Sequence, residues 1–196
     1  MRPLRPGRGW NIIGARILEG GMLGCVVTPD GHARARLLRG LVARLGSEGW
    51  RLAGAIDLPA PVRAGVRLRR QMLLSVLGAE PSEIVDIAQD LGPLARGCKL
   101  DPGALERVAG LAEAALGRGA DLVIVNKFGK REAEGRGFRP LIGQALAAGV
   151  PVLVGLAPAR RDEFDAFAAG MAEEVAPRAA ALRAWASAHR AALADP

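Results

Sequence analysis

The chain has 196 residues, half of them hydrophobic, and 27 Lys and Arg against 20 Asp and Glu give it a net charge of +7. This length suits one domain with a sizeable core. No apolar run is long enough to span a bilayer and the first residues lack a signal-peptide pattern, so we expect a cytoplasmic protein that does not bind membranes. Two distant cysteines indicate neither a disulfide framework nor a metal cluster.

The predicted elements begin after a basic, Pro- and Gly-rich stretch, residues 1–21, which we interpret as an N-terminal extension. Residues 22–196 are expected to form a single domain. Residues 22–27 predict a buried strand. A turn at Pro29 to Gly31 leads into a helix with Leu38, Leu41 and Leu45 on one face, and residues 50–57 predict a second strand. This β-α-β pattern predicts a parallel sheet.

Residues 58–100 break the regular pattern. A loop with four arginines is followed by "QMLLSVL" and "SEIVDIAQDL", which predict an inserted strand pair. A helix follows, with Asp101 as N-cap, Pro102 in its first turn and glycines at its end. Next come a strand over 121–125, a glycine-rich loop, a helix over 140–148, a strand over 152–156 and two C-terminal helices broken at Pro177. The fold class is therefore α/β, a three-layer sandwich with a mostly parallel sheet.

The loop after the strand at 121–125, "NKFGKREAEGRGFRP", is the first candidate site. Ligands of open parallel sheets bind beyond the carboxyl ends of strands, where glycines let the backbone approach an anion and bases supply charge. We expect a phosphate or other oxyanion as guest; the alternative is a solvated basic loop. The candidate ligand-binding residues are Asn126, Lys127, Gly129, Lys130, Arg131, Glu134, Gly135, Arg136 and Gly137. Glu132 is the candidate catalytic residue, through contact with a water or metal.

A phosphate-binding Walker A loop would read G-x-x-x-x-G-K-[ST] after the first strand, but the chain there reads "VVTPDGHARARLL". With no lysine or following hydroxyl, ordinary ATP or GTP hydrolysis is disfavoured.

The second candidate constellation is "AQDLGPLARGCKLDPG", with Asp90, Cys98 and Lys99 as further ligand-binding candidates. Bases beside Cys98 would favour its thiolate. The alternative is a turn with a helix cap and a half-buried thiol. Nucleic acid is an unlikely partner, because the aromatic interleaving of single-strand binding platforms is missing.

The segments "IAQDLG", "GCKLDPGAL" and "DLVIVNKFGKREAEGRGFRPLIGQALAAGVPVLVGL" closely resemble an uncharacterised bacterial family, domain of unknown function 2478, over about 24–175. The resemblance implies a P-loop NTPase-like fold with a degenerate Walker A. Asn126 and Lys127 stand where related nucleoside-triphosphatases carry acids, which argues against Mg²⁺-dependent hydrolysis. The association of some members with molybdenum or nitrogenase genes implies molybdate as a candidate oxyanion.

The resemblance and the basic loop together predict a protein that binds a nucleotide phosphate or small oxyanion, at most a nucleoside-triphosphatase-like hydrolase. Mg²⁺ with a nucleotide is the cofactor that such a reaction would use, and the metal ligands are left open. The alternative is a non-catalytic accessory or regulatory module in molybdenum or nitrogenase-type metal-cofactor metabolism. Trp185, in the last helix, packs onto the domain or onto a second subunit, which leaves a homo-oligomer open.

Overall fold

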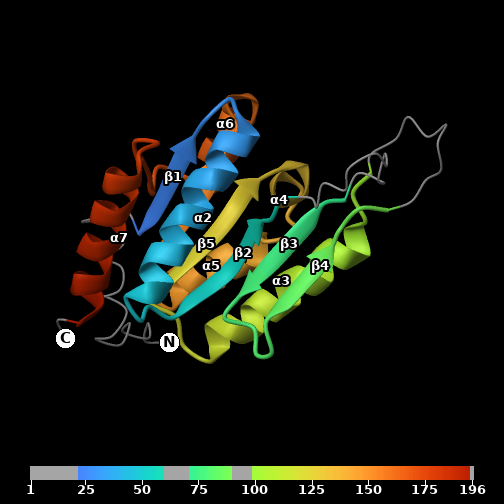
Figure 1. Cartoon of the computed structure of the whole chain (residues 1–196). Helices are drawn as coiled ribbons and strands as arrows, with labels where there is room; N and C mark the ends of the chain where they lie inside the picture. Colours follow the sequence, from blue (N-terminus) through green and yellow to red (C-terminus); the bar gives the residue numbers. More distant parts are fainter. Residues whose placement is uncertain (1–21, 60–70, 90–98, 195–196) are drawn as a thin grey trace, which may run out of the picture.

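The computed structural model describes residues 22–59, 71–89 and 99–194, and these ranges form one seven-stranded sheet (Figure 1). The strand order is β4-β3-β2-β5-β6-β1-β7. Five strands run parallel: β1 (Leu23–Val27), β2 (Leu52–Asp57), β5 (Leu122–Phe128), β6 (Val152–Leu156) and β7 (Ala172–Glu174). The inserted pair, β3 (Leu73–Leu77) and β4 (Glu83–Asp86), extends the sheet in antiparallel fashion beyond β2, as predicted.

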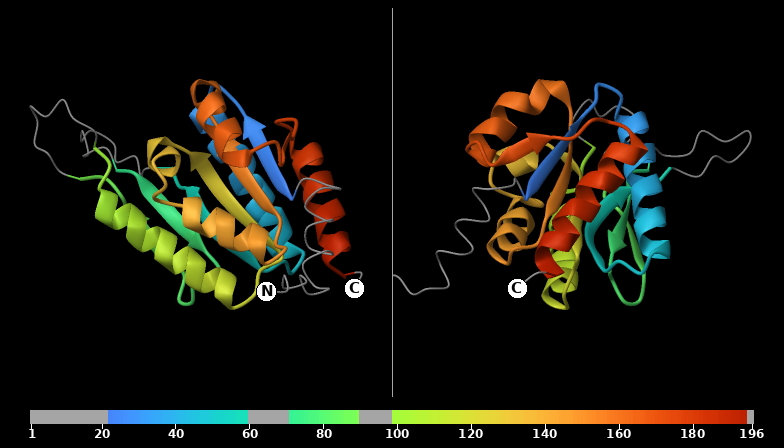
Figure 2. Two further views of the ribbon diagram at one scale, coloured as in Figure 1. Left: turned by 180° about the vertical axis from the view of Figure 1, so that it is seen from behind. Right: turned by 90° about the vertical axis from the view of Figure 1, so that its left-hand side faces the viewer.

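Helices cover both faces of the sheet (Figure 2). On one face lie α2 (Gly31–Ser47) and α7 (Ala179–Ala194), whose apolar side chains share a core with Val26, Ile124 and Leu153. On the other face lie α3 (Pro102–Gly117), α5 (Arg139–Ala147) and α6 (Arg161–Ala168), which share a second core with Val125 and Val154. The predicted three-layer α/β sandwich is therefore confirmed, and no helix in the described ranges could cross a bilayer.

Local sequence signals set several of these boundaries. The Asp101 carboxylate caps α3 by accepting hydrogen bonds from the backbone N–H groups of Gly103 and Ala104, with Pro102 in the first turn, as predicted. Asp30 caps α2 in the same way, by accepting from His32 N at 2.8 Å. Both caps satisfy backbone donors that the first helical turn leaves without intrahelical partners.

Two boundaries differ from the prediction. Strand β5 continues through Asn126 and Lys127 to Phe128, because a register shift between Val125 and Phe128 lets the pairing with β6 resume at Leu156. Between the two C-terminal helices lies a strand that the prediction missed, β7, which pairs in parallel with β1. Its three residues, Ala-Glu-Glu, are too few and too polar to show the period of two that indicates a strand.

The topology places a switch point at the carboxyl ends of β1 and β6. These neighbouring strands lead into helices on opposite faces, β1 into α2 and β6 into α6. The two connections therefore diverge, and in open parallel sheets ligands bind at such a divergence.

Candidate functional site

Arg34 reaches from the first turns of α2 across the carboxyl ends of three strands. Its side chain is 6% exposed; Nε donates to the backbone oxygen of Asn126 at 3.2 Å, and Nη1 donates to the backbone oxygen of Thr28 at 3.3 Å. It passes over Gly155 of β6, where a Cβ atom would lie 2.6 Å from Arg34 Cδ and 2.0 Å from Asn126 O. Only glycine at this position leaves room for the arginine and for the neighbouring backbone.

The Arg34 guanidinium is a buried cation held by carbonyl groups. Burial lowers its pKa from the ordinary arginine value, while the charges of Asp57 and Asp30 oppose that shift. Because arginine titrates far above neutrality, the group stays charged at pH 7. Its two hydrogen bonds go to neutral backbone oxygens, so an anion would give the guanidinium a charged hydrogen-bond partner that these oxygens do not provide.

The side chain of Asn126 is buried without a partner. The residue is 3% exposed, and neither Oδ1 nor Nδ2 has a hydrogen bond to any atom of the described ranges. A buried polar group without a partner costs about 1–3 kcal/mol. Native proteins keep few such groups, and a catalytic or ligand-binding role is one of the accepted reasons.

The connection between β1 and α2 is not an open phosphate cradle. Against the Walker A pattern, Thr28 and Ala33 stand at the two glycines and Arg34 stands at the lysine. The Asp30 carboxylate accepts hydrogen bonds from the backbone of Ala33 and His32, which hold its pKa below the ordinary value. The chain's own carboxylate therefore takes the N–H groups that would otherwise receive a phosphate. Our sequence analysis did not single out Arg34, although this alignment with the pattern could have identified it.

Glu132 organises the loop after β5. Its buried carboxylate accepts hydrogen bonds from Gly129 N to Oε2 at 2.8 Å and from Phe138 N to Oε1 at 3.1 Å. Gly137, with φ of +59°, passes so close that a Cβ atom would lie 2.3 Å from Glu132 Oε1. Both carboxylate oxygens thus bind backbone donors, which positions the loop and leaves the predicted contact with a catalytic water without support in this geometry.

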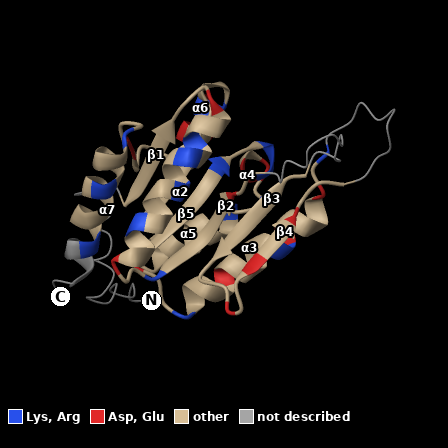
Figure 3. Cartoon of the chain, in the orientation of Figure 1, with Lys and Arg blue, Asp and Glu red and all other residues tan. Residues whose placement is uncertain are grey.

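The predicted anion-binding bases lie around the same loop but make separate contacts. Lys130 and Arg131 each lie 3.7 Å from Glu134, while Lys127 and Arg136 are exposed. In Figure 3 the backbone positions of Lys and Arg residues, coloured blue, lie near the start of α2 and at the β5–α4 connection, where α4 spans Lys130–Ala133. Within the described ranges no recorded contact joins these four bases to the Asn126 side chain.

The second predicted constellation is only partly described. Asp90 and Cys98 lie outside the described residues. Lys99 is exposed, and its backbone oxygen accepts a hydrogen bond from Gln89 N at 2.7 Å.

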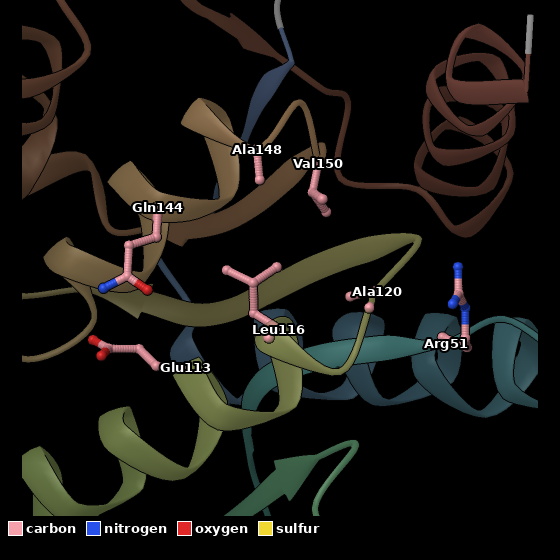
Figure 4. Close-up of a pocket in the computed structure, with 9 residues that line it drawn as sticks. Arg51, Glu113, Leu116, Ala120, Gln144, Ala148 and Val150 are labelled. Carbon is pink, nitrogen blue, oxygen red and sulfur yellow. The ribbon is translucent and has the colours of Figure 1, made fainter. Parts of the chain in front are cut away.

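A cavity of about 460 Å³ lies at the opposite, amino edge of the sheet, between the ends of α3 and α5 (Figure 4). Leu116, Ala120 and Val150 form its apolar walls, and Glu113, Gln144 and Arg51 are its polar lining residues. Arg51 is already bound, since Nη2 lies 3.0 Å from Asp121 Oδ1. This cavity does not coincide with any residue of the predicted anion site.

Comparison with known proteins gives one family and one relative. The profile of a family described as "Protein of unknown function (DUF2478)" matches residues 23–185. The chain is 30% identical over 137 residues to "Molybdenum import ATP-binding protein ModC 2" of Bradyrhizobium diazoefficiens. That match covers 70% of this chain but 15% of the relative, so the chain spans much less than two thirds of that protein's length. No solved structure matches.

Proposed function

We propose, since the chain belongs to the protein family of unknown function DUF2478, that it binds a phosphate group or another small oxyanion at the carboxyl edge of its sheet. The single observation that carries this proposal is the pairing of a buried cation, Arg34, with the partnerless buried amide of Asn126 at the divergence of β1 and β6. A ligand supplies what each group lacks: a negative charge for the first and hydrogen bonds for the second.

The bases predicted from the sequence add to this site from its rim. We assign direct anion contact to Arg34 and Lys127, because Lys127 follows Asn126 in β5 and its side chain is exposed. Lys130 and Arg136 attract the anion from the loop held by Glu132. Lys130 reaches only a distant partner, Glu134, at 3.7 Å, so turning toward a ligand costs it little.

Binding without hydrolysis is the activity that these contacts favour. Glu132 uses both oxygens on backbone donors, and the Asp30 carboxylate occupies the start of α2. Neither is poised to activate water or to cradle a triphosphate. The same two observations favour a regulatory or accessory module over a nucleoside-triphosphatase.

The α/β fold and the name of the relative suggest the candidate ligands. That name concerns molybdenum import and ATP binding by a much longer protein. We therefore include molybdate and ATP, beside inorganic phosphate, among the ligands to be tested.

The test is isothermal titration calorimetry of the full chain with phosphate, ATP, molybdate and tungstate at constant ionic strength. We expect at least one of these anions to bind, and Lys127→Ala to weaken it roughly tenfold, as expected for the loss of a charged contact. Arg44→Ala, which removes an exposed base from the last turn of α2 at the other edge, is the matched control and should leave the affinity unchanged. Absence of binding by every anion, or equal losses in the two variants, contradicts the proposal.

A further inference from the structure

The Asn126 side chain imposes a chemical requirement on any ligand that relieves it. Its amide offers an N–H donor at Nδ2 and an acceptor at Oδ1, and both atoms are buried without partners. A ligand that satisfies both must present an acceptor and a donor side by side. This requirement is the same whichever way the amide is oriented, because exchanging its two ends exchanges the two needs.

The described neighbours of Asn126 do not meet the need for a donor. The nearby guanidinium of Arg34 gives Nε to the backbone oxygen of Asn126 and Nη1 to that of Thr28, so these donors miss the amide. Lys127 is exposed at the next position of the strand. In this arrangement the described residues leave Oδ1 without a donor, and a guest that carries an O–H would supply one.

We infer, on the basis of the proposed function, that Asn126 makes the site selective for an oxyanion that carries a proton, and thus for inorganic phosphate over molybdate, tungstate and sulfate. Near neutral pH inorganic phosphate keeps at least one O–H beside bare oxygens, so it donates to Oδ1 and accepts from Nδ2. A phosphate group in ester linkage has mostly lost that proton at pH 7. Molybdate, tungstate and sulfate are fully deprotonated at that pH. Each of them has only acceptor oxygens, which cannot form a hydrogen bond with the acceptor Oδ1.

Entry of the guest requires a small rearrangement, because both amide atoms are closed to solvent. Arg34 is the neighbour best placed to move. Two hydrogen bonds of 3.2 and 3.3 Å to carbonyl oxygens hold it, and an anion offers its guanidinium a charged partner instead. Once Arg34 has turned toward the anion, the anion contacts the Asn126 amide, and this contact determines which anions bind tightly.

A deprotonated anion would leave the Oδ1 acceptor without a hydrogen bond. This loss predicts that phosphate binds roughly ten- to a hundredfold more tightly than such an anion. Calorimetric competition near neutral pH, at equal ionic strength, should show phosphate binding at least tenfold more tightly than sulfate, molybdate and tungstate. Asn126→Leu should reduce that ratio to about one. ATP and ADP form separate arms. Their terminal phosphate is mostly deprotonated near neutral pH, so they should compete with inorganic phosphate only weakly, and competition as strong as that of phosphate itself contradicts selectivity for a protonated oxyanion.

Asn126→Asp is the second variant, and it keeps the shape of the side chain while offering only acceptors. It should weaken every anion but widen the preference for phosphate, because a proton donor is then indispensable. Phosphate and molybdate binding within threefold of each other in the wild type overturns the inference. So does an unchanged ratio in both Asn126 variants.

The failures of the two proposals differ. If no anion binds, the proposed function itself is wrong. If all anions bind equally and Lys127→Ala weakens them together, the proposed function stands and the selectivity by Asn126 falls.

Discussion

The two edges of the sheet differ in how their polar groups are satisfied. At the amino edge a cavity of about 460 Å³ lies open, and its lining residue Arg51 is already bound: Asp121 accepts from Arg51 N at 2.9 Å and pairs with Arg51 and Arg190. Arg190 in turn stacks on the Trp50 ring at 4.4 Å. At the carboxyl edge Arg34 and Asn126 are buried, and the amide of Asn126 has no hydrogen-bond partner among the residues that the structure describes.

This contrast shows that a cavity and a buried polar group without a hydrogen-bond partner are separate indications of a binding site. A shallow cavity with paired charges arises wherever two helices end beside a sheet. A buried amide without partners costs folding free energy, so it calls for an explanation that the cavity does not need. We therefore propose the carboxyl edge as the binding site, and three substitutions test the distinction.

The largest expected effect concerns Glu132, whose satisfied carboxylate contrasts with the unsatisfied amide six residues earlier. Glu132→Ala removes the acceptors of Gly129 N and Phe138 N and should lower the free energy of unfolding by about 3 kcal/mol, measured by urea denaturation. Glu134→Ala, in the same turn but exposed and paired only at 3.7 Å, should change it by less than about 0.5 kcal/mol. Equal losses would show that the loop does not depend on Glu132.

A smaller loss is expected at the amino edge, from Asp121→Ala. Burial alone would raise the pKa of Asp121, but hydrogen bonds from Arg51 and the charges of Arg51 and Arg190 hold it below the ordinary value. At pH 7 the substitution should cost about 1.5 kcal/mol. A carboxyl with a lowered folded pKa stabilises above the unfolded value, near pH 4, and loses that contribution as pH falls through the folded value.

The loss at Asp121 should therefore shrink as the pH falls below about 4. Urea denaturation across that range measures it, with the exposed Asp162→Ala as the control that should cost little at any pH. A loss independent of pH would mean that packing, rather than charge, holds this edge.

The smallest expected effect is an increase, rather than a decrease, in the free energy of unfolding. It tests the comparison of the two sheet edges most directly. Asn126→Leu replaces a partnerless amide by an apolar group of similar size and should raise the free energy of unfolding of the ligand-free protein by about 1 kcal/mol. Gln144→Leu, at an exposed amide, should be neutral within about 0.5 kcal/mol. Added phosphate should reverse the order of wild type and Asn126→Leu, because the wild type binds phosphate more tightly and is therefore stabilised more at the same phosphate concentration. A destabilised Asn126→Leu without ligand would show that the amide is already satisfied.

Much of the fold could be predicted because it is encoded by local signals. Asp101 followed by Pro102 marks the start of α3, and the apolar runs at residues 122–125 and 152–156 mark central strands buried on both faces. The end of β5 could not be predicted in this way. The chain turns polar at Asn126, whereas the structure continues the strand by a register shift that depends on the neighbouring β6.

The location of the candidate site could be predicted from the sequence, but the roles of its residues could not. The carboxyl end of β5 was identified from its bases and glycines, but Asn126 was distinguished from Lys127 only by burial, which depends on tertiary packing. Glu132 was assigned to chemistry because an acid among bases suits it, and its backbone partners depend on how the loop folds back. Arg34 was read as part of an amphipathic helix, since one basic residue among several does not reveal that it is buried.

Gly155 has a consequence for engineering and for divergence of this fold. A methyl group there would overlap the carbonyl oxygen of Asn126 at 2.0 Å, so β5 and β6 could no longer approach as they do. A chain with alanine at this position would have to separate the two strands locally, and the amide would face a different direction even if Asn126 and Arg34 were retained. Transfer of the proposed ligand-contacting side chains, Arg34 and Asn126, into another scaffold should therefore fail unless the position equivalent to Gly155 is also a glycine.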